Sequence, residues 1–147
     1  MKITICGSTA FINEMERVAL ELEALGHEVK FPPVKFTDHD GKEWHTSEYY
    51  EFKKTEPYDD PKFLNNHTQR IQDHFNCVEW SDVILVTNYD KNGVENYIGP
   101  NTLIEMGLAL YLKKKIFLLN PLPNLPWKEE IIGLRPIVIS GDLTLVV

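Results

Sequence analysis

Short apolar runs alternate along this chain with longer segments in which apolar residues recur every three or four positions. The runs predict β-strands over 3–6, 27–31, 81–87, 115–119 and 136–139, with a further short edge strand at 143–147. The periodic segments predict helices over about 10–25 and 66–80, a helix that begins at Pro100, and a short helix near 127–132.

This alternation indicates an α/β fold in which a parallel sheet carries helices on both faces. Each crossover is expected to be right-handed. The simplest assembly is a flavodoxin-like three-layer sandwich around a five-stranded, mainly parallel sheet with strand order 2-1-3-4-5. The length of 147 residues suits a single domain that spans 1–147.

The segment 32–65 breaks the alternation. It is rich in aromatic and acidic residues and shows no clear period, although 43–54 is compatible with a short helix. Irregular segments of this length inside a domain are often lids or binding segments. We therefore interpret it as an insertion over the carboxyl ends of the strands. The alternative is an acidic surface excursion with an aromatic cluster of its own.

Charge and composition narrow the class of partner. The formal net charge of −7 argues against a surface for a nucleic-acid polymer, but a small nucleotide needs only a local group of donors. No apolar run approaches the ~20 residues that span a bilayer, so no membrane association is expected. The start of the chain shows no signal-peptide pattern, and Cys6 and Cys77 make no disulfide framework. A cytoplasmic location is the default expectation.

Glu105 is the main candidate for chemistry. The helix that begins at Pro100, with Gly99 as its N-cap, places Glu105 on or beside an apolar face that includes Met106. A buried carboxylate is costly unless a partner compensates it. The helix dipole is expected to favour its ionised form. The alternative is a surface glutamate that pairs with Lys113.

Three segments are expected to meet outside the carboxyl ends of the first and third strands, where the strand order reverses. They are the turn Gly7-Ser8-Thr9, Asn88 with its neighbours, and the amino end of the Glu105 helix. The backbone of the first turn is suited to an anion, although a tight turn with a helix cap explains it equally well. The chain has no Gly-x-Gly-x-x-Gly fingerprint after this strand.

The two histidines of the predicted helix 66–80 are weaker candidates. His67 and His74 are seven residues apart, no third ligand follows from their spacing, and the chain has no His-Glu-x-x-His pattern. We expect both to cap or to pack, and we expect neither a metal ion nor an organic cofactor.

Four stretches, in order, resemble the nucleoside 2-deoxyribosyltransferase superfamily, including its deoxynucleoside monophosphate N-glycosidase branch. The Glu-x-Gly-x-Ala core, followed by a basic turn and a strand, carries most of the resemblance, and 32–65 lies outside it. The stretches are Ile5-Cys6-Gly7-Ser8, the run Trp-Ser-Asp-Val-Ile-Leu-Val at 80–86, the segment 99–109 centred on Glu-Met-Gly-Leu-Ala, and Lys-Ile-Phe-Leu-Leu at 115–119.

The resemblance implies a mechanism. The glutamate of that core is the nucleophile in the superfamily, which would be Glu105, and an aspartate near the preceding strand assists the base, which would be Asp82. A carboxylate that attacks the anomeric carbon forms a glycosyl-enzyme ester, which water or a second base then resolves. From the residues alone, Asp82 is equally consistent with a cap at the start of its strand.

The resemblance also implies a substrate site. The turn after the first strand holds the sugar or its 5′ group in the superfamily, which would be Gly7 and Ser8. Gly99 stands where members carry an aspartate or a serine, and Asn101 offers an amide nearby. Members often complete the pocket from a neighbouring subunit, so a homo-oligomer is expected.

Two functions follow as hypotheses. The first is cleavage or transfer of the N-glycosidic bond of a (deoxy)nucleoside or its monophosphate through Glu105. The second is a catalytically silent nucleotide-binding or sensing module. A weaker third is a phage- or defence-associated interaction protein that uses the acidic, aromatic segment 32–65.

Overall fold

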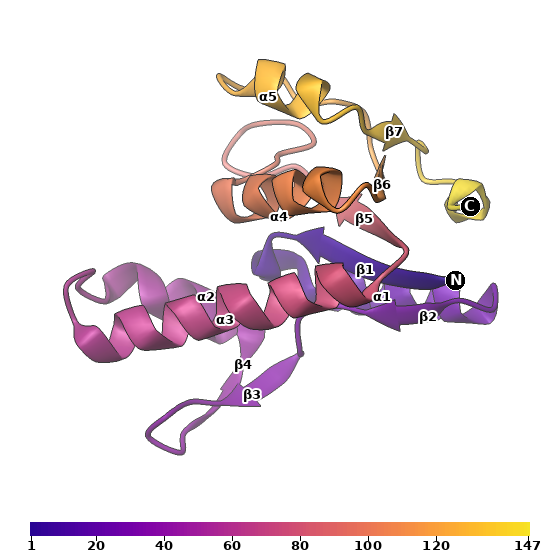
Figure 1. The fold of residues 1–147 in the computed structure, drawn as a ribbon. Helices are drawn as coiled ribbons and strands as arrows, with labels where there is room; N and C mark the ends of the chain where they lie inside the picture. Colours follow the sequence, from indigo (N-terminus) through magenta and orange to yellow (C-terminus); the bar gives the residue numbers. More distant parts are fainter.

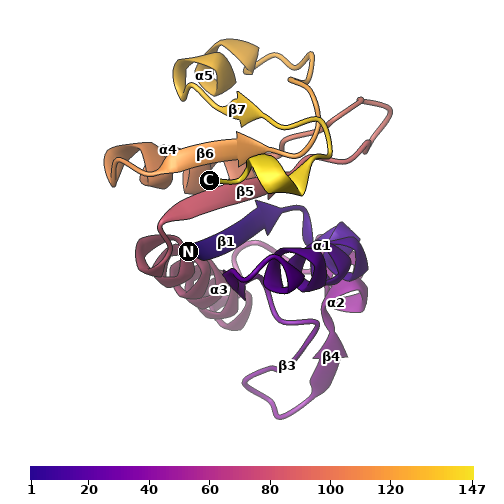
Figure 2. The same ribbon diagram turned by 90° about the vertical axis from the view of Figure 1, so that its right-hand side faces the viewer.

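A five-stranded sheet forms the centre of the molecule (Figures 1 and 2). The structure is a computed structural model that describes all residues, 1–147. Neighbouring strands are parallel throughout, in the order β2-β1-β5-β6-β7. The strands are β1 (Lys2–Gly7), β2 (Glu28–Lys30), β5 (Val83–Thr87), β6 (Lys115–Leu118) and β7 (Ile137–Val138).

Helices cover both faces of this sheet and bury two separate cores. One face packs against α1 (Ile12–Ala24) and the 3-10 helix η3 (Leu143–Leu145). The other packs against α3 (Pro61–Trp80), α4 (Pro100–Tyr111) and α5 (Lys128–Gly133). None of the helices is both long enough and apolar enough to cross a membrane. The α/β class and the helices on both faces are therefore confirmed.

The pleat of β1 decides which residues reach which core. Successive side chains of a strand point to opposite faces, so Ile3 and Ile5 join the α1 core while Cys6 joins the core under α3 and α4. Thr4 points to the same side as Cys6, where its hydroxyl donates to the Cys77 carbonyl at 2.7 Å. This alternation places the Cys6 thiol next to α4.

The segment 32–65 is folded. β3 (Lys35–Thr37) and β4 (Glu43–His45) form an antiparallel hairpin outside the main sheet, and α2 (Thr46–Phe52) and η2 (Lys53–Thr55) follow. Its aromatic residues form a cluster. Trp44 stacks on Phe52 with 4.7 Å between ring centroids, and Phe36 meets the edge of Tyr49 at 5.0 Å.

Three expectations need correction. The expected strand order is 2-1-3-4-5, and the order in the structure is β2-β1-β5-β6-β7. The numbers differ because the hairpin strands β3 and β4 lie between β2 and β5 in the sequence and pair only with each other. The expected edge strand at 143–147 is wrong, since Asp142 accepts from the Thr144 amide and starts η3. α3 begins at Pro61 rather than at 66, because Asp60 caps it and Pro61 takes the first position.

Candidate active site

A cavity of about 590 Å³ lies beside the turn that follows β1. Its walls come from this turn, the loop between β5 and α4, the amino half of α4, the inner face of α3 and the segment 32–65. A volume of this size is typical of small-molecule sites. The carboxyl edge of a parallel sheet is where such folds bind ligands, so the cavity is the candidate site.

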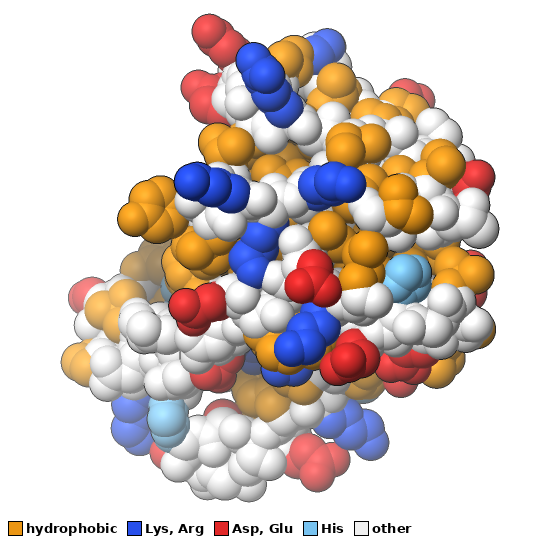
Figure 3. All heavy atoms as spheres, turned by 45° about the vertical axis from the view of Figure 1, so that its right-hand side comes forward, with side chains coloured by type: hydrophobic (Ala, Val, Ile, Leu, Met, Phe, Trp, Pro, Cys, Tyr) orange, Lys and Arg blue, Asp and Glu red, His pale blue; other side chains and the backbone are white.

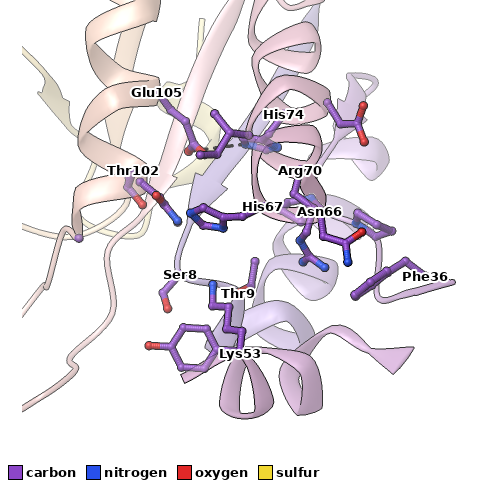
Figure 4. A pocket seen from close by; sticks show the side chains of 18 of the residues that line it. Ser8, Thr9, Phe36, Lys53, Asn66, His67, Arg70, His74, Thr102 and Glu105 are labelled. Atoms are coloured by element: carbon purple, nitrogen blue, oxygen red, sulfur yellow. Dashed lines mark ion pairs between the residues drawn. The ribbon is translucent and has the colours of Figure 1, made fainter. Parts of the chain in front are cut away.

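Glu105 and His74 form one end of the cavity (Figure 4). Their side chains are only 13% and 10% exposed, and Nε2 of His74 lies 3.6 Å from Oε2 of Glu105. That separation is too long for a good hydrogen bond, and neither atom has another partner. The sulfur of Cys6 completes the group, with all three donor atoms within 4.8 Å of one another.

Burial keeps this pair uncharged. It raises the pKa of Glu105 to about 8, an effect that the neighbouring Cys6 thiol opposes only in part, and it lowers the pKa of His74 to about 4. The expectation that the helix dipole holds Glu105 ionised is therefore wrong. Glu105 lies in the second turn of α4, beyond the reach of the dipole. The alternative prediction, a surface ion pair between Glu105 and Lys113, is also wrong, since the carboxyl group is buried in the cavity wall.

The other end of the cavity is cationic. Lys53, Arg70 and Lys91 line it without an ion pair to any acidic side chain. Burial lowers the pKa of Lys53 to about 8, and repulsion from Arg70 and Lys91 adds to the effect. The Arg70 guanidinium lies on the rings of Phe36 and Tyr49, 4.2 and 4.8 Å from their centroids. Figure 4 shows His67 between this end and Glu105.

The concentration of cations is local. The chain carries a net charge of −7, and on the face in Figure 3 basic and acidic side chains are interspersed. Asp38 and Asp73 also line the cavity, but neither forms an ion pair with these three cations, which repel one another and lose hydration in the partly buried cavity. An anionic ligand would relieve both costs.

The turn after β1 lies on the cavity wall, as expected. Gly7, Ser8 and Thr9 all line the cavity. A Cβ at Gly7 would lie 2.5 Å from Oγ1 of Thr87, so β1 and β5 can approach here only because the residue is glycine. Ser8 caps a 3-10 helix, η1 (Thr9–Phe11), and its hydroxyl accepts a hydrogen bond from Nζ of Lys91 at 2.9 Å.

Gly99 and Asn101 line the cavity at the start of α4. Gly99 is the N-cap residue, and a Cβ there would lie 3.1 Å from Cε1 of Tyr97. Glycine at this position therefore leaves room for the Tyr97 ring, which also lines the cavity. Asn101 is exposed at its rim.

Two predicted site residues lie elsewhere. Asp82 precedes β5 at the opposite edge of the sheet, where its Oδ2 accepts from the Lys2 amide at 2.8 Å. Its prediction as a catalytic residue is corrected to the role of tying β5 to β1. Asn88 is fully buried, and its amide group bonds the backbones of Asn120 and Pro121, with Oδ1 accepting from the Asn120 amide at 2.9 Å. It holds two loops together and does not line the cavity.

Most of the polar residues of the cavity were not predicted from the sequence. His67, Arg70 and His74 stand at i, i+3 and i+7 on α3 and therefore share one helix face. That spacing was visible in the sequence, but both histidines were expected to cap or to pack. Lys53 belongs to the segment without a period, which no pattern places.

Comparisons with known proteins bear on the fold. No protein-family model matches the chain, and no curated protein sequence matches it. Among solved structures, the CMP N-glycosidase BcmB of Clostridium botulinum superposes with a TM-score of 0.50 and 19% identity, over 94% of this chain and 85% of that one. This chain has the fold of BcmB.

The likeness to BcmB shows the fold, which agrees with the α/β fold that the sequence predicts. The 2-deoxyribosyltransferase of Bacillus psychrosaccharolyticus is also similar, with a TM-score of 0.49 and 18% identity over 80% of this chain and 71% of that one.

Proposed function

We propose that the protein cleaves or transfers the N-glycosidic bond of a nucleoside monophosphate, with Glu105 as the nucleophile. One observation carries the proposal. A buried carboxyl group faces one end of a cavity whose other end holds three unpaired cations. BcmB, by its name, acts on CMP, and the fold that it shares with this chain is compatible with such a reaction.

The cationic end suits the phosphate. Lys53, Arg70 and Lys91 supply charged donors, and hydrogen bonds between charged groups are among the strongest in proteins. With the phosphate held there, the sugar extends along the cavity towards Glu105. The anomeric carbon then lies within reach of the carboxylate.

Glu105 attacks in its ionised form, after the proton that burial favours on it has passed to water. The carboxylate bonds to the anomeric carbon as the C–N bond to the base breaks, the base takes up a proton from water, and a glycosyl-enzyme ester results. Water resolves the ester in hydrolysis, and a second base resolves it in transfer. His74 lies beside the nucleophile, with its Nε2 3.6 Å from Oε2 of Glu105.

Release of free base tests the proposal. The protein is incubated with ribo- and deoxyribonucleosides and with their 5′-monophosphates, and free base is measured by chromatography. We expect release from a monophosphate at least about 10-fold faster than from its nucleoside, since a charged hydrogen bond contributes about 1.5–3 kcal/mol. Faster release from the nucleoside would overturn the role of the phosphate.

The second candidate is a binding or sensing module. One observation favours it, which is that Asp82, the residue expected to assist the base, does not line the cavity. Nucleotide binding without release of base from any compound of the panel would support this candidate over the enzyme.

A further inference from the structure

We propose that Cys6, His74 and Glu105 bind a zinc ion. A thiol sulfur, an imidazole nitrogen and a carboxylate oxygen are the three donor types that Zn²⁺ takes in proteins. They come from three elements far apart in the sequence, β1, α3 and α4, and converge within 4.8 Å of one another. No metal-binding spacing is visible in the sequence, because the site exists only once these elements pack.

The environment of the donors points to a ligand between them. Nε2 of His74 and Oε2 of Glu105 are both inaccessible to solvent and lack a hydrogen-bond partner, although they face each other at 3.6 Å. Buried polar atoms are rarely left without partners. A shared cation would satisfy both atoms, and the Cys6 sulfur lies beside them.

The separations suit a small tetrahedral ion. Zn²⁺ bonds of about 2.0–2.3 Å place tetrahedral ligand atoms roughly 3.3–3.7 Å apart. The His74–Glu105 separation of 3.6 Å already falls in this range, so the sulfur needs to move inward by at most about 1.5 Å. Magnesium and calcium prefer oxygen ligands alone, so the sulfur of Cys6 favours zinc over both.

The charges balance when the ion binds. The Cys6 thiol and the Glu105 carboxyl group each lose one proton to solvent, and the resulting thiolate and carboxylate neutralise Zn²⁺ while His74 remains neutral. A neutral complex is the form that a buried site tolerates best. His74 and Glu105 both line the cavity, so the site would lie in the cavity wall.

Zinc and the glycosidic reaction would compete for Glu105. A carboxylate bound to the ion cannot attack the anomeric carbon, so the metal acts as an inhibitor. This consequence rests on the proposed function, whereas the binding of the metal does not.

Cobalt titration tests the site directly. The full-length protein is titrated with Co²⁺ alone, which replaces zinc and gives visible bands and a near-ultraviolet thiolate-to-cobalt band in a tetrahedral site. We expect one equivalent to bind and Zn²⁺ to displace it. Absence of the thiolate band in the wild-type protein at saturating Co²⁺ would overturn the proposal.

Variants identify the ligands. Cys6→Ser should abolish the thiolate band, and His74→Gln should weaken Co²⁺ binding by more than the roughly 10- to 100-fold that loss of an outer partner costs. Cys77→Ser is the matched control and should keep the band. If Cys6→Ser fails to fold, His74→Gln decides, with circular dichroism to verify its fold. A band that persists in Cys6→Ser or disappears in Cys77→Ser would contradict the assignment.

The two proposals fail separately. A thiolate band without base release from any nucleotide leaves the metal site standing and removes the enzyme. Base release without the band leaves the enzyme standing and removes the metal site. If both are observed, stoichiometric Zn²⁺ should suppress base release, and a chelator should restore it.

Discussion

The two ends of the cavity differ in how burial acts on them. The acidic end consists of Cys6, His74 and Glu105. There, burial raises the pKa of Glu105 to about 8 and makes the carboxyl group neutral. At the cationic end, burial and mutual repulsion lower the pKa of Lys53 to about 8, but Arg70 stays charged against the rings of Phe36 and Tyr49. One end therefore avoids charge, and the other concentrates it.

This difference indicates what each end lacks. The cationic end lacks an anion, which a phosphate supplies. The acidic end lacks a positive partner, which either the developing charge at the anomeric carbon or a metal ion supplies. Both ends carry unfavourable terms in the free protein that a suitable ligand removes, as is common at functional sites.

Removal of the carboxyl group at the acidic end should have the largest effect, and the affected quantity is the rate of base release. Glu105→Gln keeps the size and the helix but removes the nucleophile, so base release should fall by at least about 10³-fold. The rate is measured by chromatography under saturating monophosphate, with binding measured separately by calorimetry. A variant that binds as before and releases base at the wild-type rate would remove Glu105 from the mechanism.

The same variant should be more stable than the wild type at high pH. Between pH 4.5 and 8 the folded state holds a proton on Glu105 that the unfolded state has lost, so the free energy of unfolding falls as the pH rises. Glutamine does not titrate. The free energy of unfolding of the variant, relative to that of the wild type, should therefore rise by about 4 kcal/mol between pH 4.5 and 8.5.

Urea unfolding at pH 5, 7 and 9 measures this gain. Subtracting the variant from the wild type removes most of the contribution of His74, because the burial that lowers its pKa remains in both proteins. That subtraction matters because the pKa of His74 is lowered to about 4, so its own effect is loss of stability as the pH falls below 6.5. A difference between the two proteins that stays constant with pH would contradict the burial of a neutral carboxyl group.

The acidic end was the more predictable from sequence. The periodic segment after Pro100 predicted Glu105 on or beside an apolar face, and the expected order of strands placed the start of that helix beside Gly7. Its partners were not predicted, since contact of His74 with Glu105 depends on how α3 packs against α4. The position of Cys6 could be predicted, because alternating side chains along β1 put it on the face opposite Ile5.

The cationic end was not predictable in the same way. Lys53 comes from the segment 32–65, whose hairpin pairs outside the main sheet and leaves no period in the sequence. The error over Asp82 has a different origin. A residue that precedes a strand lies at its amino end, opposite the edge where parallel sheets bind ligands, so chain order alone argued against the role that the resemblance implied.

Loss of one cation should weaken recognition of the phosphate. Arg70→Gln removes a charged donor, and KM for a monophosphate should rise by about 10- to 100-fold, because hydrogen bonds to charged groups contribute about 1.5–3 kcal/mol. Binding of the parent nucleoside should change much less. Arg17→Gln is the matched control, since Arg17 is 70% exposed on α1 and pairs only with Glu14. Equal losses for nucleotide and nucleoside would indicate a structural role for Arg70.

The smallest effect is expected outside the cavity. Asp82→Asn weakens the hydrogen bond to the Lys2 amide at the far edge of the sheet, so stability should fall by about 1 kcal/mol while base release stays within about twofold. Thermal unfolding and the base-release rate are measured on the same preparation. A large loss of base release at unchanged stability would restore Asp82 to the mechanism, and would mean that the acidic end extends beyond Cys6, His74 and Glu105.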